Sequence, residues 1–203
     1  MEGPGAGDHQ DRVNMSAEVK VFIAGSRALT RLNEPLRRRL DRIMAEQFAI
    51  LIGDASGADK AVQVYLAAKE YETVTVYCTG PRCRNNLRPW PIKTVAPPPG
   101  VRSGFDYYAA KDQAMAADAS HGLMIWDGES RGTFTNVVNL VAQHKPVIVY
   151  LSHARAFRNL YTTADLFSVL DDATTEARRQ LEPLIRRLAT RREPCPGIPA
   201  SLF

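Results

Sequence analysis

Residues 20–53 read KVFIAGSRALTRLNEPLRRRLDRIMAEQFAILIG, and this stretch decides the fold. It opens with a short apolar run that ends in glycine, KVFIAG at 20–25, and it closes with another, AILIG at 49–53. The residues between the runs place apolar side chains on one helical face, namely Leu36, Leu40, Ile43 and Met44. Runs that are apolar throughout are typical of strands buried on both faces, so we expect a parallel strand–helix–strand unit here.

The same alternation continues along the chain. Three further apolar runs follow, VTVYC at 74–78, GLMIW at 122–126 and PVIVYL at 146–151. A segment suited to a helix precedes each of them, at 59–69, 105–117 and 133–144. Because right-handed crossovers join such strands into one parallel sheet, we predict an α/β fold, a Rossmann-like three-layer sandwich with a mainly parallel sheet of about five strands.

The two ends of the chain differ from this central part. Residues 1–17 are rich in glycine and acids and are expected to form a flexible leader, whereas the sheet domain is expected to span 18–155. Residues 156–203 are expected to form a C-terminal helical extension, because apolar residues recur with helical periodicity from Leu166 to Leu188. This apolar stripe could cover the sheet of its own chain or a second subunit, and a homodimer is the expected state.

The composition is that of a globular protein, since 45% of the 203 residues are hydrophobic and 24% are charged. No apolar run is long enough for a membrane span, and the first residues lack the apolar core of a signal peptide. We therefore expect a cytoplasmic protein without a membrane partner. The formal net charge of +4 suits phosphate-bearing small molecules, and nucleic acid is the less favoured partner.

Cysteine and histidine spacing does not favour a metal site. The three cysteines, Cys78, Cys83 and Cys195, lack the paired spacing of zinc sites and are too few for a disulfide framework, so we expect buried or free thiols. The four histidines also show no metal-ligand spacing. Neither a metal nor a cofactor is expected.

Glycine and small polar residues follow four of the predicted strands, as GSR at 25–27, GDASGAD at 53–59, TG at 79–80 and DGESRGT at 127–133. In an open parallel sheet, ligands bind at the carboxyl ends of the strands, where glycine allows close approach and a helix start favours an anion. Any strand-to-helix turn uses such residues, but four such loops together favour a phosphate site. Neither G-x-G-x-x-G nor G-x-x-x-x-G-K-[ST] is present, so dehydrogenase and ATPase assignments lose their support.

The loops and their flanks resemble the SLOG superfamily over about residues 19–151. The resemblance is carried by GSR at 25–27, GDASGADKAVQ at 53–63, YAAKDQAMAADAS at 108–120 and GESRGTFTNVV at 128–138. That superfamily is similar to the LOG nucleotide phosphoribohydrolases, the Smf-type DNA-processing proteins and a set of nucleotide sensors. The resemblance implies a Rossmann-like fold, a nucleotide or nucleotide-derived ligand at the strand ends, and frequently a dimer.

The resemblance also implies a set of ligand-binding residues. Those bordering the ligand or shaping the opposite wall are Gly25, Ser26, Arg27, Gly53, Asp54, Gly57 and Asp59. At the fourth loop and the helix after it, Ser130, Gly132 and Thr133 would hold phosphate, and Asp127 and Asn136 are further expected ligand-binding residues.

Position 136 departs from the phosphoribohydrolase pattern PGGxGTxxE. The closing Glu of that pattern serves the glycosidic-bond chemistry, and three residues after Thr133 this chain has Asn136. An amide cannot act as a carboxylate base or stabilise an oxocarbenium ion by charge, so hydrolysis by the family mechanism is in doubt. Asp54, Asp59 and Asp112 are the candidates for an alternative catalytic carboxylate, although helix capping, turns or solvation would also explain each of them.

The irregular stretch from Thr79 to Gly104 is long for a connector. Its side chains suited to a nucleotide are Arg82, Arg84, Asn85, Asn86, Arg88 and Trp90, and Tyr107, Tyr108 and Lys111 follow it. A plain surface loop with a locally packed Trp90 is the alternative.

Three functions of different classes remain open. The favoured one is a nucleotide-binding or nucleotide-sensing module without turnover. The second is an N-glycosidase or related transferase acting on a nucleotide. The third is a single-stranded nucleic-acid binder, which the mildly basic body of the chain and its lack of aromatic residues on a basic stripe disfavour.

Overall fold

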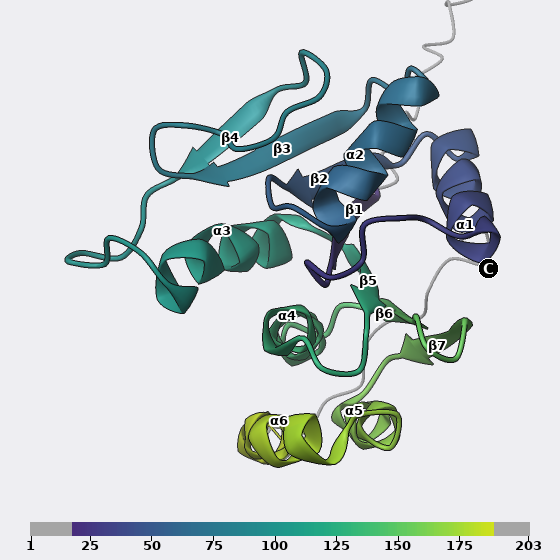
Figure 1. The fold of residues 1–203 in the computed structure, drawn as a ribbon, viewed down its shortest axis with the longest axis vertical. Helices are drawn as coiled ribbons and strands as arrows, with labels where there is room; N and C mark the ends of the chain where they lie inside the picture. The colour runs from purple at the N-terminus through teal and green to yellow at the C-terminus, as the bar shows by residue number, and fades with distance from the viewer. Residues whose placement is uncertain (1–17, 189–203) are drawn as a thin grey trace, which may run out of the picture.

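A computed structural model describes residues 18–188, and Figure 1 shows one sheet flanked by helices. The elements in chain order are β1 (Lys20–Gly25), α1 (Glu34–Ala45), β2 (Ala49–Gly53), α2 (Ala58–Ala68), β3 (Val74–Thr79), β4 (Ile92–Val95), α3 (Phe105–Asp118), β5 (His121–Trp126), α4 (Arg131–Ala142), β6 (Val147–Leu151), β7 (Ala156–Leu160), α5 (Thr163–Leu170) and α6 (Thr175–Leu188). The predicted leader and the last part of the C-terminal extension, 189–203, lie outside the described residues.

The strands form one sheet in the order β4-β3-β2-β1-β5-β6-β7. All neighbours are parallel except β6 and β7, which pair as an antiparallel hairpin with Val147 opposite Leu160. The predicted mainly parallel α/β sandwich is confirmed, but the sheet has seven strands and not about five.

The two additional strands lie at the edges of the sheet. β4 falls in the stretch expected to be irregular, and β7 lies in the segment expected to be only helical, so the predicted boundary after residue 155 falls inside the β6–β7 hairpin. Most side chains of both strands are exposed or only partly buried. Because an edge strand needs no continuous apolar run, neither strand produced the pattern by which the buried strands were predicted.

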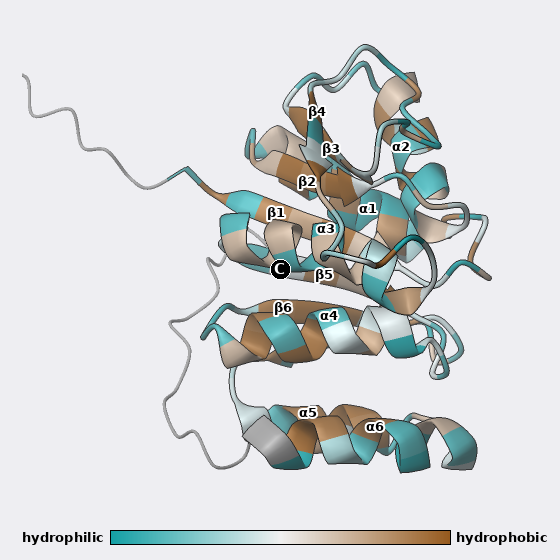
Figure 2. Cartoon of the chain, turned by 90° about the vertical axis from the view of Figure 1, so that its left-hand side faces the viewer, coloured by the Kyte–Doolittle hydropathy of each residue, from teal (hydrophilic) through white to brown (hydrophobic). Residues whose placement is uncertain are grey.

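Helices cover both faces of the sheet. Leu36, Leu40 and Ile43 of α1 share one buried cluster with Val62 and Leu66 of α2. The opposite face is covered by α3 and α4, whose apolar residues form a second cluster with other strand side chains. In Figure 2 the inner strands are largely brown, whereas the helices alternate brown and teal, as expected for strands buried on both faces.

The C-terminal helices extend the layer formed by α4 (Figures 1 and 2). The single helical region expected from periodicity is divided into α5 and α6, and a capping box of Thr162 and Asp165 begins α5. The stripe expected to cover a sheet or a partner is buried within the chain, in the same cluster as α4, through Leu166, Val169, Leu170, Ala177, Leu181 and Ile185. This packing removes the apolar stripe as a reason for a dimer, and the homodimer stays a prediction from the resemblance. Over residues 18–188, no helix has the length and apolar character to cross a membrane.

Candidate functional site

A cleft of about 560 Å³ opens at the carboxyl ends of β1 and β5. The chain leaves β1 toward β2 on one side and leaves β5 toward β6 on the other, so the cleft lies at the switch point of the sheet, where open α/β sheets bind ligands. Its walls come from the loops after β1, β2 and β3, from α3 and from one side of α4, including its first turn. The volume is in the range of small-molecule pockets.

Two of the glycine-rich loops press against each other behind this cleft. Gly57 has a φ of +81°, and a Cβ atom there would lie 2.3 Å from the backbone oxygen of Arg27. The Ser26 hydroxyl donates to the carboxylate of Asp127, which also accepts from the backbone amides of Glu129 and Ser130. Ser26 and Asp127 therefore join the first loop to the fourth.

These contacts lower the pKa of Asp127. Burial by itself would raise the pKa of this carboxyl, but the hydrogen bonds from Ser26 and from the Ser130 and Glu129 amides outweigh burial and hold the pKa below its usual value. A carboxylate with all these donors is well suited to fixing the loop.

The start of α4 faces the cleft. Ser130 is the N-cap, and its hydroxyl oxygen accepts from the Thr133 amide at 3.4 Å and from the Thr133 hydroxyl at 3.0 Å. Arg131 and Gly132 complete this turn, and all four residues line the cleft. The unpaired amides and positive dipole end of a helix start favour an anion.

A row of buried and partly buried polar side chains forms the floor of the cleft. Lys111 of α3 is 4% exposed, and its Nζ lies 2.7 Å from Oδ1 of Asp112. The other carboxylate oxygen of Asp112 accepts a 3.2 Å hydrogen bond from Nδ2 of Asn136. Asp59, which is 5% exposed, accepts from the Ala55 amide at 3.2 Å.

Gly53 leaves room for this row at the end of β2. A Cβ atom there would lie 2.4 Å from Oδ2 of Asp59 and 2.7 Å from Nζ of Lys111. The absence of a side chain at position 53 therefore allows the buried carboxylate and the buried ammonium group to approach the same point of the backbone.

Burial and charge oppose each other in this row. Burial raises the pKa of Asp59 to about 6, although Lys111 lowers it in part. Burial also acts to lower the pKa of Lys111, but the carboxylates of Asp112 and Asp59 outweigh burial and raise it. The Lys111 ammonium group therefore stays charged at neutral pH, and Asp59 takes up a proton as the pH falls through about 6.

Ionisation of Asp59 should lower the free energy of unfolding as pH rises from about 4 to about 6. Its pKa is raised in the folded state, so the folded state binds the proton more tightly than the unfolded state, and stability is lost as the group ionises. At about 1.4 kcal/mol per pKa unit, a rise from 3.8 to about 6 corresponds to about 3 kcal/mol. Urea unfolding at several pH values checks this as the difference between wild type and Asp59→Asn, and parallel pH curves would contradict it.

Arginine side chains line the rim of the cleft. Arg84 pairs with Asp54 through two hydrogen bonds, Nε to Oδ2 at 3.0 Å and Nη2 to Oδ1 at 2.5 Å, and its guanidinium lies 4.2 Å from the centre of the Tyr108 ring. The guanidinium of Arg131 lies 4.9 Å from the centre of the Phe105 ring. With Arg27, three arginines line the same cleft, and guanidinium groups bind phosphate by bidentate hydrogen bonds.

The structure brings many of the residues expected at the site together. The predicted ligand-binding and catalytic residues that line the cleft are Gly25, Arg27, Asp59, Asp112, Ser130, Gly132, Thr133 and Asn136. Those that lie behind the lining and shape its loops are Ser26, Gly53, Asp54, Gly57 and Asp127. Of the candidate catalytic carboxylates, Asp59 and Asp112 thus reach the cleft, whereas Asp54 is paired with Arg84.

Sequence reasoning missed Arg131, Phe105 and Asn139, all of which line the cleft. Asn139 could have been found, because it follows Asn136 by three residues and so shares its helix face. Phe105 gave no signal, since its place depends on how the preceding loop returns to the sheet.

The long loop between β3 and β4 contributes less than its composition suggested. Trp90 is 3% exposed and donates from Nε1 to the Tyr71 carbonyl, and Arg88 pairs with Glu72. Asn86 donates to the Trp90 carbonyl. These residues build the loop, and Arg84 is the member of the set that reaches the cleft.

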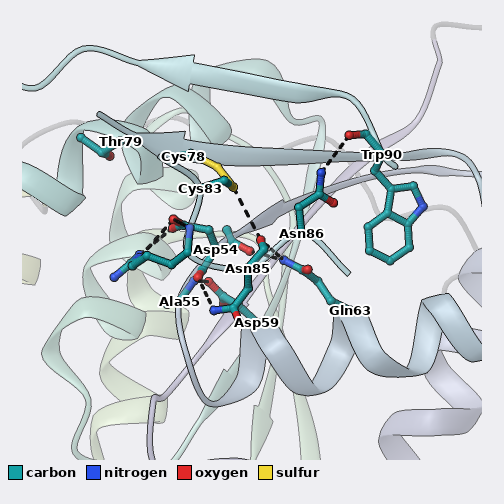
Figure 3. The surroundings of a disulfide bond; sticks show 12 residues. Asp54, Ala55, Asp59, Gln63, Cys78, Thr79, Cys83, Asn85, Asn86 and Trp90 are labelled. Atoms are coloured by element: carbon teal, nitrogen blue, oxygen red, sulfur yellow. Dashed lines mark hydrogen bonds and ion pairs between the residues drawn. A yellow bond between two sulfur atoms is a disulfide. The ribbon is translucent and has the colours of Figure 1, made fainter. Parts of the chain in front are cut away.

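Two cysteines were expected to be free or buried thiols, and the structure corrects this. Cys78 of β3 and Cys83 form a disulfide bond (Figure 3), with Cα atoms 5.3 Å apart. The two sulfur atoms and a carboxylate oxygen of Asp54 all lie within 4.8 Å of one another, as the ligands of a metal ion would. However, the sulfur atoms are bonded to each other, and the Asp54 carboxylate is paired with Arg84. The separation of five residues between Cys78 at the end of β3 and Cys83 in the loop that follows is not a zinc-like spacing, so only the fold reveals the pair.

The sequence matches no protein-family model and no curated protein. Among solved structures, the chain is similar to DNA processing protein A from Helicobacter pylori, whose structure was described for its single-stranded DNA binding mode. The two chains share 14% identity over 84% of this chain and 81% of that chain, with a TM-score of 0.47.

Proposed function

We propose that this protein binds a nucleotide or nucleotide-derived ligand in the cleft at the ends of β1 and β5, as a binding or sensing module. The observation that carries the proposal is the lining itself, in which Arg27, Arg84 and Arg131 surround a cleft of about 560 Å³ that includes the first turn of α4. Guanidinium groups and a helix start that line the same cleft suit a ligand with one or more phosphates.

The rest of the lining suits the other parts of such a ligand. Asn139 and Gln113 offer amides that can both donate and accept, as the edges of a base or the hydroxyls of a sugar require. Tyr108 and Phe105 supply apolar surface, although an arginine already lies over each ring. The carboxylates of Asp59 and Asp112 in the floor disfavour a ligand that places phosphate deep in the cleft, so we expect the phosphates at the Arg27 and α4 side.

Replacing Arg27 with alanine is expected to weaken nucleotide binding by about 1.5–3 kcal/mol, the usual range for a charge-assisted hydrogen bond, with little loss of stability. Titration calorimetry against a panel of nucleoside mono- and diphosphates, sugar phosphates and a single-stranded oligonucleotide measures this. The matched control is Arg38→Ala, because Arg38 lies on α1 with its side chain 66% exposed. Unchanged affinity in folded Arg27→Ala would remove Arg27 from the site, and binding of the oligonucleotide alone would favour the nucleic-acid function.

A second candidate, N-glycosidase activity, is favoured by Asp112. The amide at position 136 cannot supply negative charge, but it donates to the Asp112 carboxylate 3.2 Å away, so a carboxylate from α3 lies beside the position of the missing one. Asp112 would stabilise an oxocarbenium-like sugar, and Asp59, with a pKa of about 6, could protonate a leaving base.

Chromatography of free base after long incubation with nucleotides distinguishes the two candidates. Release above a no-enzyme control that is lost in Asp112→Asn, with nucleotide affinity retained, would favour the glycosidase. No release from a nucleotide that binds the wild type would leave binding as the function.

A further inference from the structure

The disulfide bond lies at the same edge of the sheet as the cleft. Cys78 is 1% exposed near the carboxyl end of β3, and Cys83 is half-buried in the loop that follows (Figure 3). The bond closes a small ring of residues 78–83. Gly80, with a φ of +81°, turns the backbone inside this ring.

The residue directly after the ring is Arg84. Its backbone amide donates to Oδ2 of Asp54 at 3.0 Å, and its guanidinium holds both oxygens of the same carboxylate. Asp54 is itself 2% exposed in its side chain, so it is a fixed acceptor at the end of β2. Arg84 is therefore held at the rim of the cleft from two directions, by Asp54 through hydrogen bonds and by Cys83 through the chain.

Polar contacts also hold the part of the loop that directly follows Arg84. Nδ2 of Asn85 donates to the Asp54 carbonyl at 2.7 Å, and the Gln63 side chain donates to the carbonyls of Gly53 and Asn85. The Leu87 amide donates to Oε1 of Gln63 at 3.2 Å. These hydrogen bonds position the loop while the disulfide bond limits how far it can open.

We propose that Cys78 and Cys83 are a reversible thiol–disulfide pair that controls how firmly Arg84 is held at the cleft, so that ligand affinity depends on the redox state. The reductant is a low-molecular-weight thiol. Two such thiols convert the Cys78–Cys83 bond into two protein thiols and are themselves joined as a disulfide, and the reverse reaction re-forms the protein bond. The coupling to affinity rests on the proposed function, whereas the coupling to the Arg84 loop does not.

The geometry suits a reversible reaction. Exchange begins when a thiolate reaches one sulfur, and Cys83 is the partly exposed member of the pair. Because the turn at Gly80 is a property of the backbone, it keeps the two thiols close after reduction and favours re-oxidation.

Hydrogen exchange tests the coupling without any ligand. All proteins carry Cys195→Ser, so that only Cys78 and Cys83 can react. Reduction of this protein, or the further substitution Cys83→Ser, is expected to speed exchange of the Arg84 and Leu87 amides by about tenfold or more, because the loop can open without the ring. The Thr162 amide at the start of α5, which donates to Asp165 at 2.8 Å, is the control and should not change. Equal exchange at Arg84 and Leu87 in both redox states would overturn the proposal.

Thiol trapping and calorimetry complete the test. Thiol trapping counts the free thiols of Cys78 and Cys83 across a series of glutathione buffers. The count is expected to change reversibly between two in reducing buffers and none in oxidising buffers. Calorimetry then uses a nucleotide that the oxidised protein binds. The reduced protein is expected to bind this nucleotide about two- to tenfold more weakly than the oxidised protein does, because Arg84 must be ordered on binding. Equal affinities of the reduced and oxidised protein would overturn the proposal. It would also be overturned if the reduced protein retained one zinc ion on Asp54, Cys78 and Cys83 and could not be re-oxidised. Failure of every nucleotide to bind, with redox-dependent exchange intact, would instead reject the proposed function.

Discussion

Replacing Gly57 with alanine is expected to lower the free energy of unfolding by about 3 kcal/mol or more. Its φ of +81° is unfavourable for a residue with a side chain, and the added Cβ would lie 2.3–2.5 Å from backbone atoms of Arg27. Backbone atoms cannot rotate away as the end of a flexible side chain can. The first two loops would have to separate, and Arg27 would leave its place at the cleft.

Gly100 is the matched control for this substitution. It has the same φ of +81°, but nothing lies within 4 Å of an added Cβ atom. Gly100→Ala should therefore show only the conformational cost, about 1 kcal/mol, and the difference between the variants in urea unfolding isolates the close approach of the two loops. If both variants lose the same stability, the loops are not in contact as the structure places them.

Replacing Lys111 with methionine is expected to cost about 3–5 kcal/mol of stability at neutral pH. Methionine keeps the length of the side chain but leaves the buried carboxylate of Asp59 and the partly buried carboxylate of Asp112 without their cation. Because Lys111 lowers the pKa of Asp59, its removal should raise that pKa further above 6. The loss of stability should therefore shrink as pH falls and Asp59 takes up a proton.

Lys93→Met provides the control. Lys93 also pairs with a carboxylate, Asp118 at 2.6 Å, but its side chain is 51% exposed, so the substitution should cost less than about 1 kcal/mol. Thermal or urea unfolding at pH 5 and pH 7.5 measures the stability loss of both variants, Lys111→Met and Lys93→Met. A loss for Lys111→Met that is no larger than that of the control, or that does not change with pH, would show that Lys111 is not the buried partner of these carboxylates.

These two substitutions test different parts of the same site. Gly57 determines how the loops after β1 and β2 meet, and Lys111 determines the charge of the floor beneath them. A ligand that carries phosphate needs both, since the arginines must be placed by the loops and the floor must not repel the anion.

The buried part of the fold could be predicted from the sequence alone. Five continuous apolar runs, each separated by a segment suited to a helix, indicate a parallel sheet covered on both faces, and the glycine-rich loops mark its carboxyl ends. Arg27, Ser130 and Thr133 were located in the same way, because a residue just after a strand or at a helix start can be assigned to that edge without knowing the tertiary packing.

The remainder was decided by contacts between distant segments. The strands β4 and β7 are exposed edge strands, and they exist because neighbours offer them hydrogen bonds, not because their own side chains are apolar. The floor of the cleft joins Asp59 of α2 to Lys111 of α3 and, through Asp112, to Asn136 of α4, and the pKa of Asp59 depends on a burial that no local pattern encodes. The sequence by itself determined which residues lie at the ends of the strands. Only the tertiary structure decided which of them face the cleft and which support it, because hydrogen bonds and buried charges depend on distances between elements.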